Sequence, residues 1–191
     1  MRFRCGNIIE NDGRYEMAKK DGSKSPMDAA LDYLSAKART VREVENKLDS
    51  LSYGEYEVGQ VIVRLKELNY LNDYKYASDF VESRLRTKPV SRKKLREQLF
   101  LHFLPKGAIA EALEQVDDAT EFQNALSAAE KLMPRFSQLE TDEAKRRMAQ
   151  RLAARGFGYE TVKPVIERLY GDAEGTEAAF LEGETQSDDE A

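Results

Sequence analysis

Two clusters of basic residues are the groups in this sequence best suited to bind a partner. The first has seven cations and no acidic residue, and it consists of Arg84, Arg86, Lys88, Arg92, Lys93, Lys94 and Arg96. The second lies along one predicted helix and consists of Lys145, Arg146, Arg147, Arg151 and Arg155. Guanidinium and ammonium groups recognise phosphates and carboxylates. Each cluster therefore predicts contact with a polyanion or an acidic protein surface, unless it is an ordinary solvated helix face.

One part of the first cluster opposes helix stability. Residues 92–94 would occupy the first turn of a helix capped by Ser91, where each cation opposes the helix dipole by about 0.3–1 kcal/mol. The corresponding turns elsewhere contain Glu43, or Asp142 and Glu143, as stability prefers. A local rule broken in one turn only points to function. Free amide donors beside three cations would form an anion-binding site.

Residues suited to enzyme chemistry are scarce. His102 is the only histidine and stands in an apolar run, which predicts a partly buried helix residue rather than a catalytic base. Cys5 is the only cysteine, so an internal disulfide is impossible and a zinc site would need mostly carboxylates. Gly54 and Gly59 have the spacing of a P-loop, but the Lys and Ser or Thr that contact phosphate do not follow. We therefore expect no catalytic site, no cofactor and no metal.

A pattern of apolar residues repeats three times and must position the basic clusters. Its copies are anchored on Leu48, Leu99 and Leu152, and each has apolar residues 4 before and 5, 10, 14 and 17 after the anchor. The flanking positions are Val44, Tyr53, Val58, Ile62 and Leu65; Leu95, Leu104, Ile109, Leu113 and Val116; Met148, Phe157, Val162, Ile166 and Leu169. A period near 50 residues indicates stacked supersecondary units.

The spacing within each copy is helical. Apolar residues at i, i+4 and i+7 form one helix face, so each copy contains two helices joined by a turn and preceded by a third. Capping boxes are expected at Thr40 and Asp118, and Ser25 should cap the first helix. The prediction is an all-α fold of three tandem three-helix repeats, residues 25–72, 73–117 and 118–170, in an elongated, solenoid-like arrangement.

Two local features modify this scheme. The first helix of each copy lies progressively farther from its anchor, which predicts longer surface loops between first and second helices. Pro164 removes an amide donor early in the last helix, which predicts a late start or a kink there.

The two ends of the chain have different compositions from the repeats. Residues 1–24 are expected to form an N-terminal arm, either disordered or a small hairpin. Residues 171–191 are expected to be a disordered acidic tail that keeps the protein soluble or competes with polyanions for the basic clusters. Removing its eight negative charges from the formal net charge of −5 leaves +3. No apolar run is long enough for a membrane span or signal peptide, and the single cysteine suits a reducing cytoplasm, so we expect a cytoplasmic protein. We also expect a monomer.

Over residues 27–169 the sequence resembles the RecX family, bacterial regulators of the RecA recombinase. The head of the second copy carries the family's acidic, basic-aromatic and arginine pattern at Asp73, Lys75, Tyr76, Phe80, Val81, Arg84, Arg92 and Leu99. Arg39-Thr40-x-x-Glu43-Val44-x-x-Lys47-Leu48 fits the first copy, and Arg155-Gly156-Phe157-x-Tyr159 fits the third. The chain departs from the family in the loop at Lys88-Pro89 and in the turn of residues 103–107.

The resemblance implies binding along the groove of a RecA–DNA filament, with inhibition of recombinase and ATPase activity. The implied partners are RecA and single- or double-stranded DNA, contacted directly or through RecA by the two basic clusters. A direct nucleic-acid binder and a helical interaction scaffold remain as alternatives.

Overall fold

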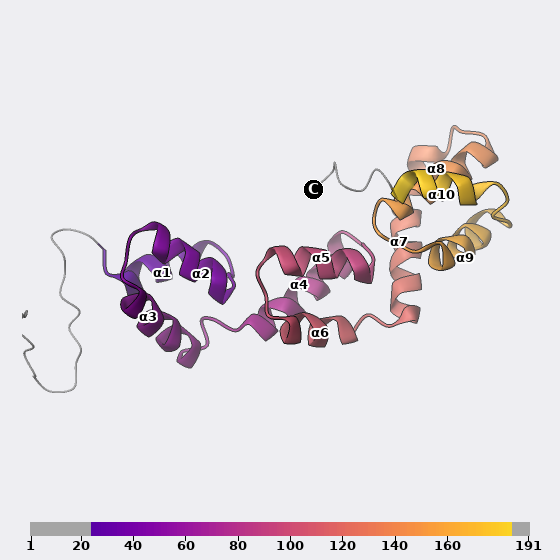
Figure 1. Ribbon diagram of the computed structural model, residues 1–191. Coiled ribbons are helices and arrows are strands. Elements are labelled where there is room, and N and C mark those ends of the chain that lie inside the picture. Colours follow the sequence, from indigo (N-terminus) through magenta and orange to yellow (C-terminus); the bar gives the residue numbers. More distant parts are fainter. Residues whose placement is uncertain (1–23, 185–191) are drawn as a thin grey trace, which may run out of the picture.

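The computed structural model describes residues 24–184, which form ten α-helices and contain no strand, so the prediction of an all-α fold is confirmed. Repeat 1 comprises α1 (Pro26–Ala36), α2 (Val41–Ser50) and α3 (Glu55–Glu67), and repeat 2 comprises α4 (Asp73–Thr87), α5 (Arg92–Leu101) and α6 (Lys106–Glu114). Repeat 3 comprises α7 (Asp118–Phe136), α8 (Thr141–Ala153) and α9 (Tyr159–Tyr170), and α10 (Thr176–Glu184) follows it. The repeats lie in a row (Figure 1). The predicted arm and Cys5 lie outside the described residues.

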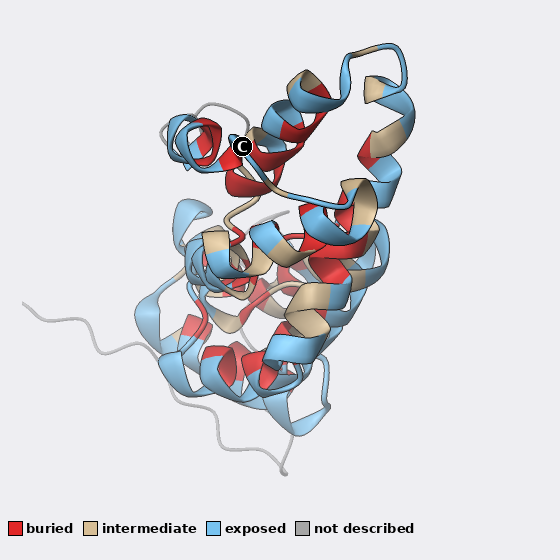
Figure 2. Cartoon of the chain, turned by 90° about the vertical axis from the view of Figure 1, so that its right-hand side faces the viewer, coloured by how far each residue is buried: buried red, intermediate tan, exposed pale blue. Residues whose placement is uncertain are grey.

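Each repeat has its own hydrophobic core, built from the predicted apolar positions. Of these eighteen positions all are buried except Tyr53 and Leu169, which are half-buried. The buried residues form three separate clusters, one in each repeat. Buried segments accordingly line the inward faces of the helices while most of the outer surface is exposed (Figure 2).

The helices begin where side chains can satisfy their free amides. Ser25 Oγ accepts the Asp28 N–H at 3.1 Å, and Thr40 forms the expected capping box. The third repeat is capped by Asp117, whose carboxylate accepts the Thr120 N–H at 2.7 Å. The box predicted at Asp118 is thus wrong by one residue.

The first helices of the repeats differ in length, and the loops after them do not. They contain 11, 15 and 19 residues in α1, α4 and α7, and the connections are residues 37–40, 88–91 and 137–140. The predicted longer loops are therefore wrong. Four residues add about one helical turn, so each extension preserves the face that the helix buries.

Pro164 lies inside α9 without delaying it. The helix begins at Tyr159, so the late start predicted from Pro164 is wrong. The neighbouring Val165 and Ile166 are fully buried in the core of repeat 3. Their burial holds a helix that lacks one backbone hydrogen bond.

The acidic tail contributes a tenth helix, so the prediction of disorder is wrong for residues 171–184. Phe180 is buried in the core of repeat 3, and its ring lies 5.3 Å from that of Tyr159. A β-carbon added to Gly183 would lie 2.6 Å from Gln150 Cα, so α10 and α8 approach closely. Sequence periodicity missed α10 because only a few small and aromatic side chains are buried in it. Residues 185–191 lie outside the described part.

The repeats meet at two joints. In the first joint, between repeats 1 and 2, the Thr40 hydroxyl donates to the His102 carbonyl at 2.9 Å. The Val41 N–H donates to the Asp73 carboxylate, also at 2.9 Å. The start of α2 is thereby closed by residues of the following repeat.

The second joint, between repeats 2 and 3, uses the same positions of the pattern. Ser91, which corresponds to Thr40, donates its N–H to the carbonyl of Arg155 at 3.1 Å, and Arg155 corresponds to His102. The backbone of Arg92 is hydrogen-bonded to the carboxylate of Glu121. In both joints, therefore, an acid from the next repeat reaches the first turn of a middle helix.

Candidate partner-binding surface

Two backbone amides in the first turn of α5, those of Arg92 and Lys94, already donate to protein groups, so they do not provide the free donors on which the predicted anion site depends. Ser91 is buried, and its hydroxyl accepts the Lys94 N–H at 3.0 Å. Glu121 accepts the hydrogen bond from the Arg92 backbone; burial raises the pKa of its carboxyl, and this hydrogen bond opposes the rise. The acid that α5 lacks in its own first turn thus comes from α7, and it offsets the opposing cations.

The side chains of the first cluster divide into two groups. Arg86, Lys88, Lys93 and Arg96 are exposed, whereas Arg84, Arg92 and Lys94 are half-buried. The guanidinium of Arg84 lies 5.0 Å above the centre of the Phe80 ring, and Lys94 Nζ lies 3.6 Å from the Glu97 carboxylate. The exposed group retains the charge that could meet a partner.

Lys145 belongs to the second cluster in the sequence, but its side chain does not reach the surface of the protein. It is buried, and its ammonium lies 2.6 Å from the Asp172 carboxylate and 3.6 Å from that of Asp142. The hydrogen bond to Asp172 raises the pKa of Lys145, and the same bond lowers the pKa of Asp172. The prediction that Lys145 binds a partner is therefore wrong, because its buried ammonium group is paired with Asp172, which precedes α10.

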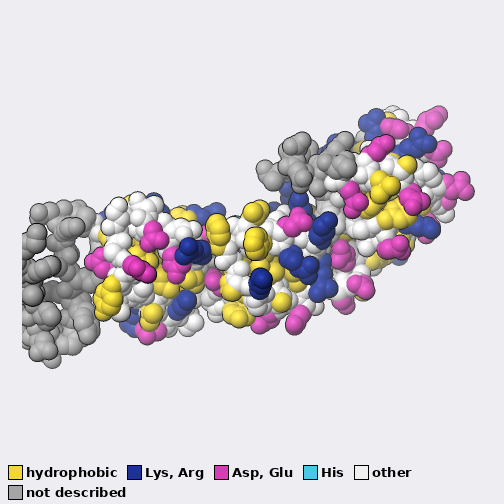
Figure 3. All heavy atoms as spheres, viewed as in Figure 1, with side chains coloured by type: hydrophobic (Ala, Val, Ile, Leu, Met, Phe, Trp, Pro, Cys, Tyr) yellow, Lys and Arg dark blue, Asp and Glu magenta, His cyan; other side chains and the backbone are white. Residues whose placement is uncertain are grey.

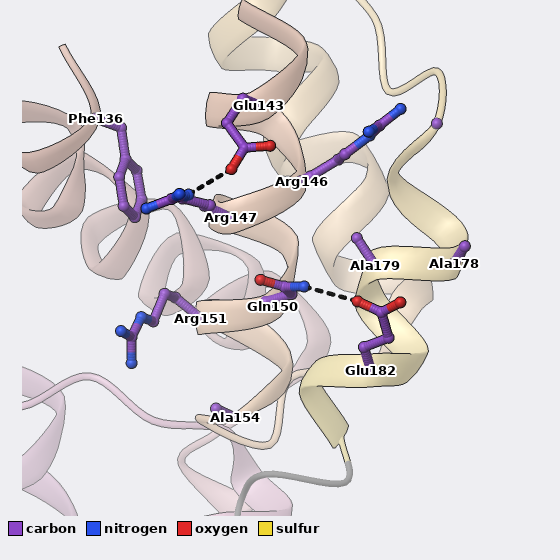
Figure 4. A pocket seen from close by; sticks show the side chains of 11 residues that line it. Phe136, Glu143, Arg146, Arg147, Gln150, Arg151, Ala154, Ala178, Ala179 and Glu182 are labelled. Atoms are coloured by element: carbon purple, nitrogen blue, oxygen red, sulfur yellow. Dashed lines mark hydrogen bonds and ion pairs between the residues drawn. The ribbon is translucent and has the colours of Figure 1, made fainter. Parts of the chain in front are cut away.

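The other arginines of α8 line an open groove beside α10. The groove has a volume of about 720 Å³, and Arg146, Arg147 and Arg151 lie along it (Figure 4). Acids share this groove: Glu143 lies 2.6 Å from Arg147 Nε, and Glu182 accepts a hydrogen bond from Gln150 at 3.0 Å. The local positive potential is accordingly reduced by carboxylates from α8 itself and from α10.

The second joint brings the ends of the two basic clusters together. A β-carbon on Gly156 would lie 2.5 Å from Ser91 Oγ and 3.2 Å from Lys94 Cβ. The half-buried Arg155 belongs to the same turn, and its guanidinium lies 3.4 Å from the Ala128 carbonyl oxygen. The start of α5 and the end of α8 therefore border a common surface, although no periodicity in the sequence indicates this proximity.

Sequence reasoning missed the interactions of His102. Its Nδ1 lies 2.9 Å from the Glu43 carboxylate, and its ring packs edge-on against Tyr76 and Phe80, at 5.6 and 5.4 Å between ring centres. The prediction of a partly buried helix residue was close, because His102 is half-buried at the end of α5. Its role in the first joint required the tertiary structure.

Two exposed apolar residues of α5 were also missed. Phe100 and Leu101 are 65% and 71% exposed, although they belong to the apolar run around His102. Helical geometry gives the signal: with Leu95 and Leu99 facing the core, the next two positions must face outward.

Among residues 24–184, no cluster of acidic, histidine or cysteine side chains could hold a metal, and no helix is long and apolar enough to cross a membrane.

Comparison with known proteins places this arrangement beside one family. Residues 27–65 match the family model of the first three-helix domain of RecX, and residues 119–166 match that of the third. Regulatory protein RecX of Clostridium botulinum (strain Alaska E43) is 30% identical over 79% of this chain and 71% of its own length. RecX of Prosthecochloris aestuarii is 30% identical over 80% of this chain and 98% of its own.

A solved structure agrees with these sequence matches. The crystal structure of RecX from Lactobacillus salivarius superimposes with a TM-score of 0.66 at 30% identity, covering 75% of this chain and 94% of that one.

Proposed function

Because the chain belongs to the RecX family of regulatory proteins, whose members regulate the RecA recombinase, we propose that it binds the RecA–DNA filament and lowers the recombinase and ATPase activities of RecA. The observation that supports filament binding is the row of three repeats held together by two matching joints (Figure 1); the direction of regulation is what the RecX resemblance implies. Such a row presents an extended surface, which suits an extended partner such as a filament.

The proposed contacts come from the basic residues whose charge reaches solvent. On repeat 2 and the loop before α5 these are Arg86, Lys88, Lys93 and Arg96, and on α8 they are Arg146, Arg147 and Arg151. The α8 residues share their groove with Glu143 and Glu182, so repeat 2 provides the stronger positive surface. We propose that a monomer meets the filament here, with DNA phosphates and RecA carboxylates both available to the cations.

ATP hydrolysis by RecA on single-stranded DNA tests this proposal. The protein is added to preformed filaments, and hydrolysis is expected to slow at amounts no greater than one molecule per RecA. The protein alone should hydrolyse no ATP. An unchanged rate at several-fold excess over RecA would contradict the proposed function, and equal binding to DNA with and without RecA would favour direct nucleic-acid binding instead.

A further inference from the structure

The middle helices of the three repeats, α2, α5 and α8, each have an outer face at equivalent positions of the pattern. The residues on this face and the segments around it differ between the repeats. We define this outer face by the positions 6, 3 and 2 before and 1 and 2 after each anchor. It consists of Arg42, Glu45, Asn46, Asp49 and Ser50 in α2; Lys93, Arg96, Glu97, Phe100 and Leu101 in α5; and Arg146, Ala149, Gln150 and Ala153 in α8 with its C-cap residue Ala154.

In repeat 3 the outer face is covered by the chain itself. Ala149 and Ala153 are buried, and α10 lies so close that a β-carbon on Gly183 would be 2.6 Å from Gln150 Cα. The covering helix is acidic: Glu182 bonds Gln150 across the contact. The small residues Ala149 and Ala153 of α8 therefore let α10, a helix that carries carboxylates, pack closely on this face.

In repeat 1 the outer face suits water. All five of its residues are polar or charged, and Arg42 forms an ion pair with Glu45 at 3.1 Å. Such a face gains little by being covered, because its groups are already hydrated or paired.

Among the described residues the outer face of α5 is uncovered, with two apolar residues at its C-terminal end and Lys93, Arg96 and Glu97 before them. Phe100 and Leu101 have most of their side-chain surface in solvent, next to the exposed cations Lys93 and Arg96. On the middle unit of Figure 3, hydrophobic side chains gather at the end facing repeat 1, and Lys and Arg side chains at the end facing repeat 3. A contiguous exposed apolar patch bordered by charge is typical of a protein interaction site.

We propose that the outer face of α5 binds an acidic helix of a partner protein, in the position that α10 occupies on α8. Lys93 and Arg96 would meet carboxylates of that helix, and the one acid of this face, Glu97, lies 3.6 Å from Lys94 Nζ. Its contacting residues would be small, because Phe100 and Leu101 replace Ala153 and Ala154 and the large side chains now lie on the receiving face. This inference rests on the proposed function for the identity of the partner, RecA, and specifies protein rather than DNA at this face.

The first experiment compares F100S/L101S with the matched control Y56S/V63S, which changes two exposed apolar residues of α3. Binding of each to RecA filaments is measured by co-sedimentation, and binding to a bare single-stranded oligonucleotide by fluorescence anisotropy. We expect F100S/L101S to bind filaments about tenfold or more weakly than the control, with equal oligonucleotide binding. Equal filament binding, or a parallel loss of oligonucleotide binding through base stacking, would overturn the inference and leave the proposed function intact.

A second probe does not depend on RecA. A fluorescent alanine-rich helical peptide with glutamates along one side is compared with the same peptide carrying lysines. The glutamate peptide should bind the wild type and the control variant Y56S/V63S. It should not bind F100S/L101S, and the lysine peptide should not bind the wild type. If the wild type binds the glutamate peptide in this pattern but does not bind RecA filaments, the proposed function is wrong and the inference about the outer face of α5 still holds. Absent binding, or binding indifferent to these changes, would overturn the inference.

Discussion

Helices α5 and α8 occupy the same place in consecutive repeats, but their basic residues have different fates. Arg92 and Lys145 are equivalent positions; Lys145 is buried against Asp172, whereas the Arg92 backbone is held by Glu121. In repeat 3 the acids before and within α10 pair with groups of α8, and the chain covers the outer face. The comparison teaches that a basic run in the sequence does not by itself give exposed charge: the acids that the chain brings to α8 bury Lys145, whereas Lys93 and Arg96 of α5 stay exposed although Glu121 lies near that helix and Glu97 lies on it.

The largest expected effect comes from uncovering α8. F180A removes a buried aromatic ring from the core of repeat 3, which should lower the free energy of unfolding by about 3–5 kcal/mol. Amide exchange in α10 and α8 should accelerate together. Urea unfolding with L181A as the exposed neighbour provides the check, since that change should cost no more than about 0.5 kcal/mol. Equal destabilisation by the two variants would mean that α10 does not cover α8.

The next largest effect is expected at the second joint. Gly156 has a φ of +83°, and its added β-carbon would lie 2.5 Å from Ser91 Oγ, so G156A combines backbone strain with a clash. We expect G156A to lower the free energy of unfolding by about 1–3 kcal/mol, measured by thermal unfolding. The control is G158A, where a β-carbon meets nothing within 4 Å. If both substitutions had the same cost, the joint would be too loose to define the arrangement of repeats 2 and 3.

A smaller effect is expected at the first joint. H102A removes the contact with Glu43 and the packing of the ring against Tyr76 and Phe80, at a cost of about 1–2 kcal/mol. H102Q should recover part of this loss by keeping a donor near Glu43. Equal unfolding midpoints for H102A and wild type would show that the hydrogen bond from the Thr40 hydroxyl to the backbone carbonyl of residue 102 is enough to hold the first joint.

The smallest effect is a pH dependence confined to repeat 3. The folded-state pKa of Asp172 is lowered by its bond to Lys145, so its stabilising contribution is present above the unfolded pKa, near 3.8, and is lost as pH falls through the lower folded value. D172N should reduce stability at neutral pH and flatten the acid limb of the stability curve. Unfolding followed between pH 2 and 7 measures this. A parallel acid limb in wild type and D172N would contradict the pairing.

Sequence alone predicted the helices and the core better than the surface. The apolar positions around Leu48, Leu99 and Leu152 follow helical spacing, so burial of their faces could be derived locally. The fate of Lys145 depends on Asp172, which is 27 residues away, and the start of α5 depends on Glu121. Such pairings are set by the packing of one helix on another and leave no periodic trace. The face of α5 at Phe100 could have been found by asking which side of α5 remains outside.

Binding of charge-reversed variants to RecA filaments tests most directly whether repeat 2 provides the recognition surface. K93E/R96E reverses the open face of α5, and R146E/R151E reverses two arginines of the groove shared with Glu143 and Glu182. Both variants should unfold like wild type. K93E/R96E should weaken filament binding by about tenfold or more, or about 1.4 kcal/mol, and R146E/R151E by less than about threefold. Equal losses, or a larger loss from R146E/R151E, would contradict the assignment of recognition to repeat 2.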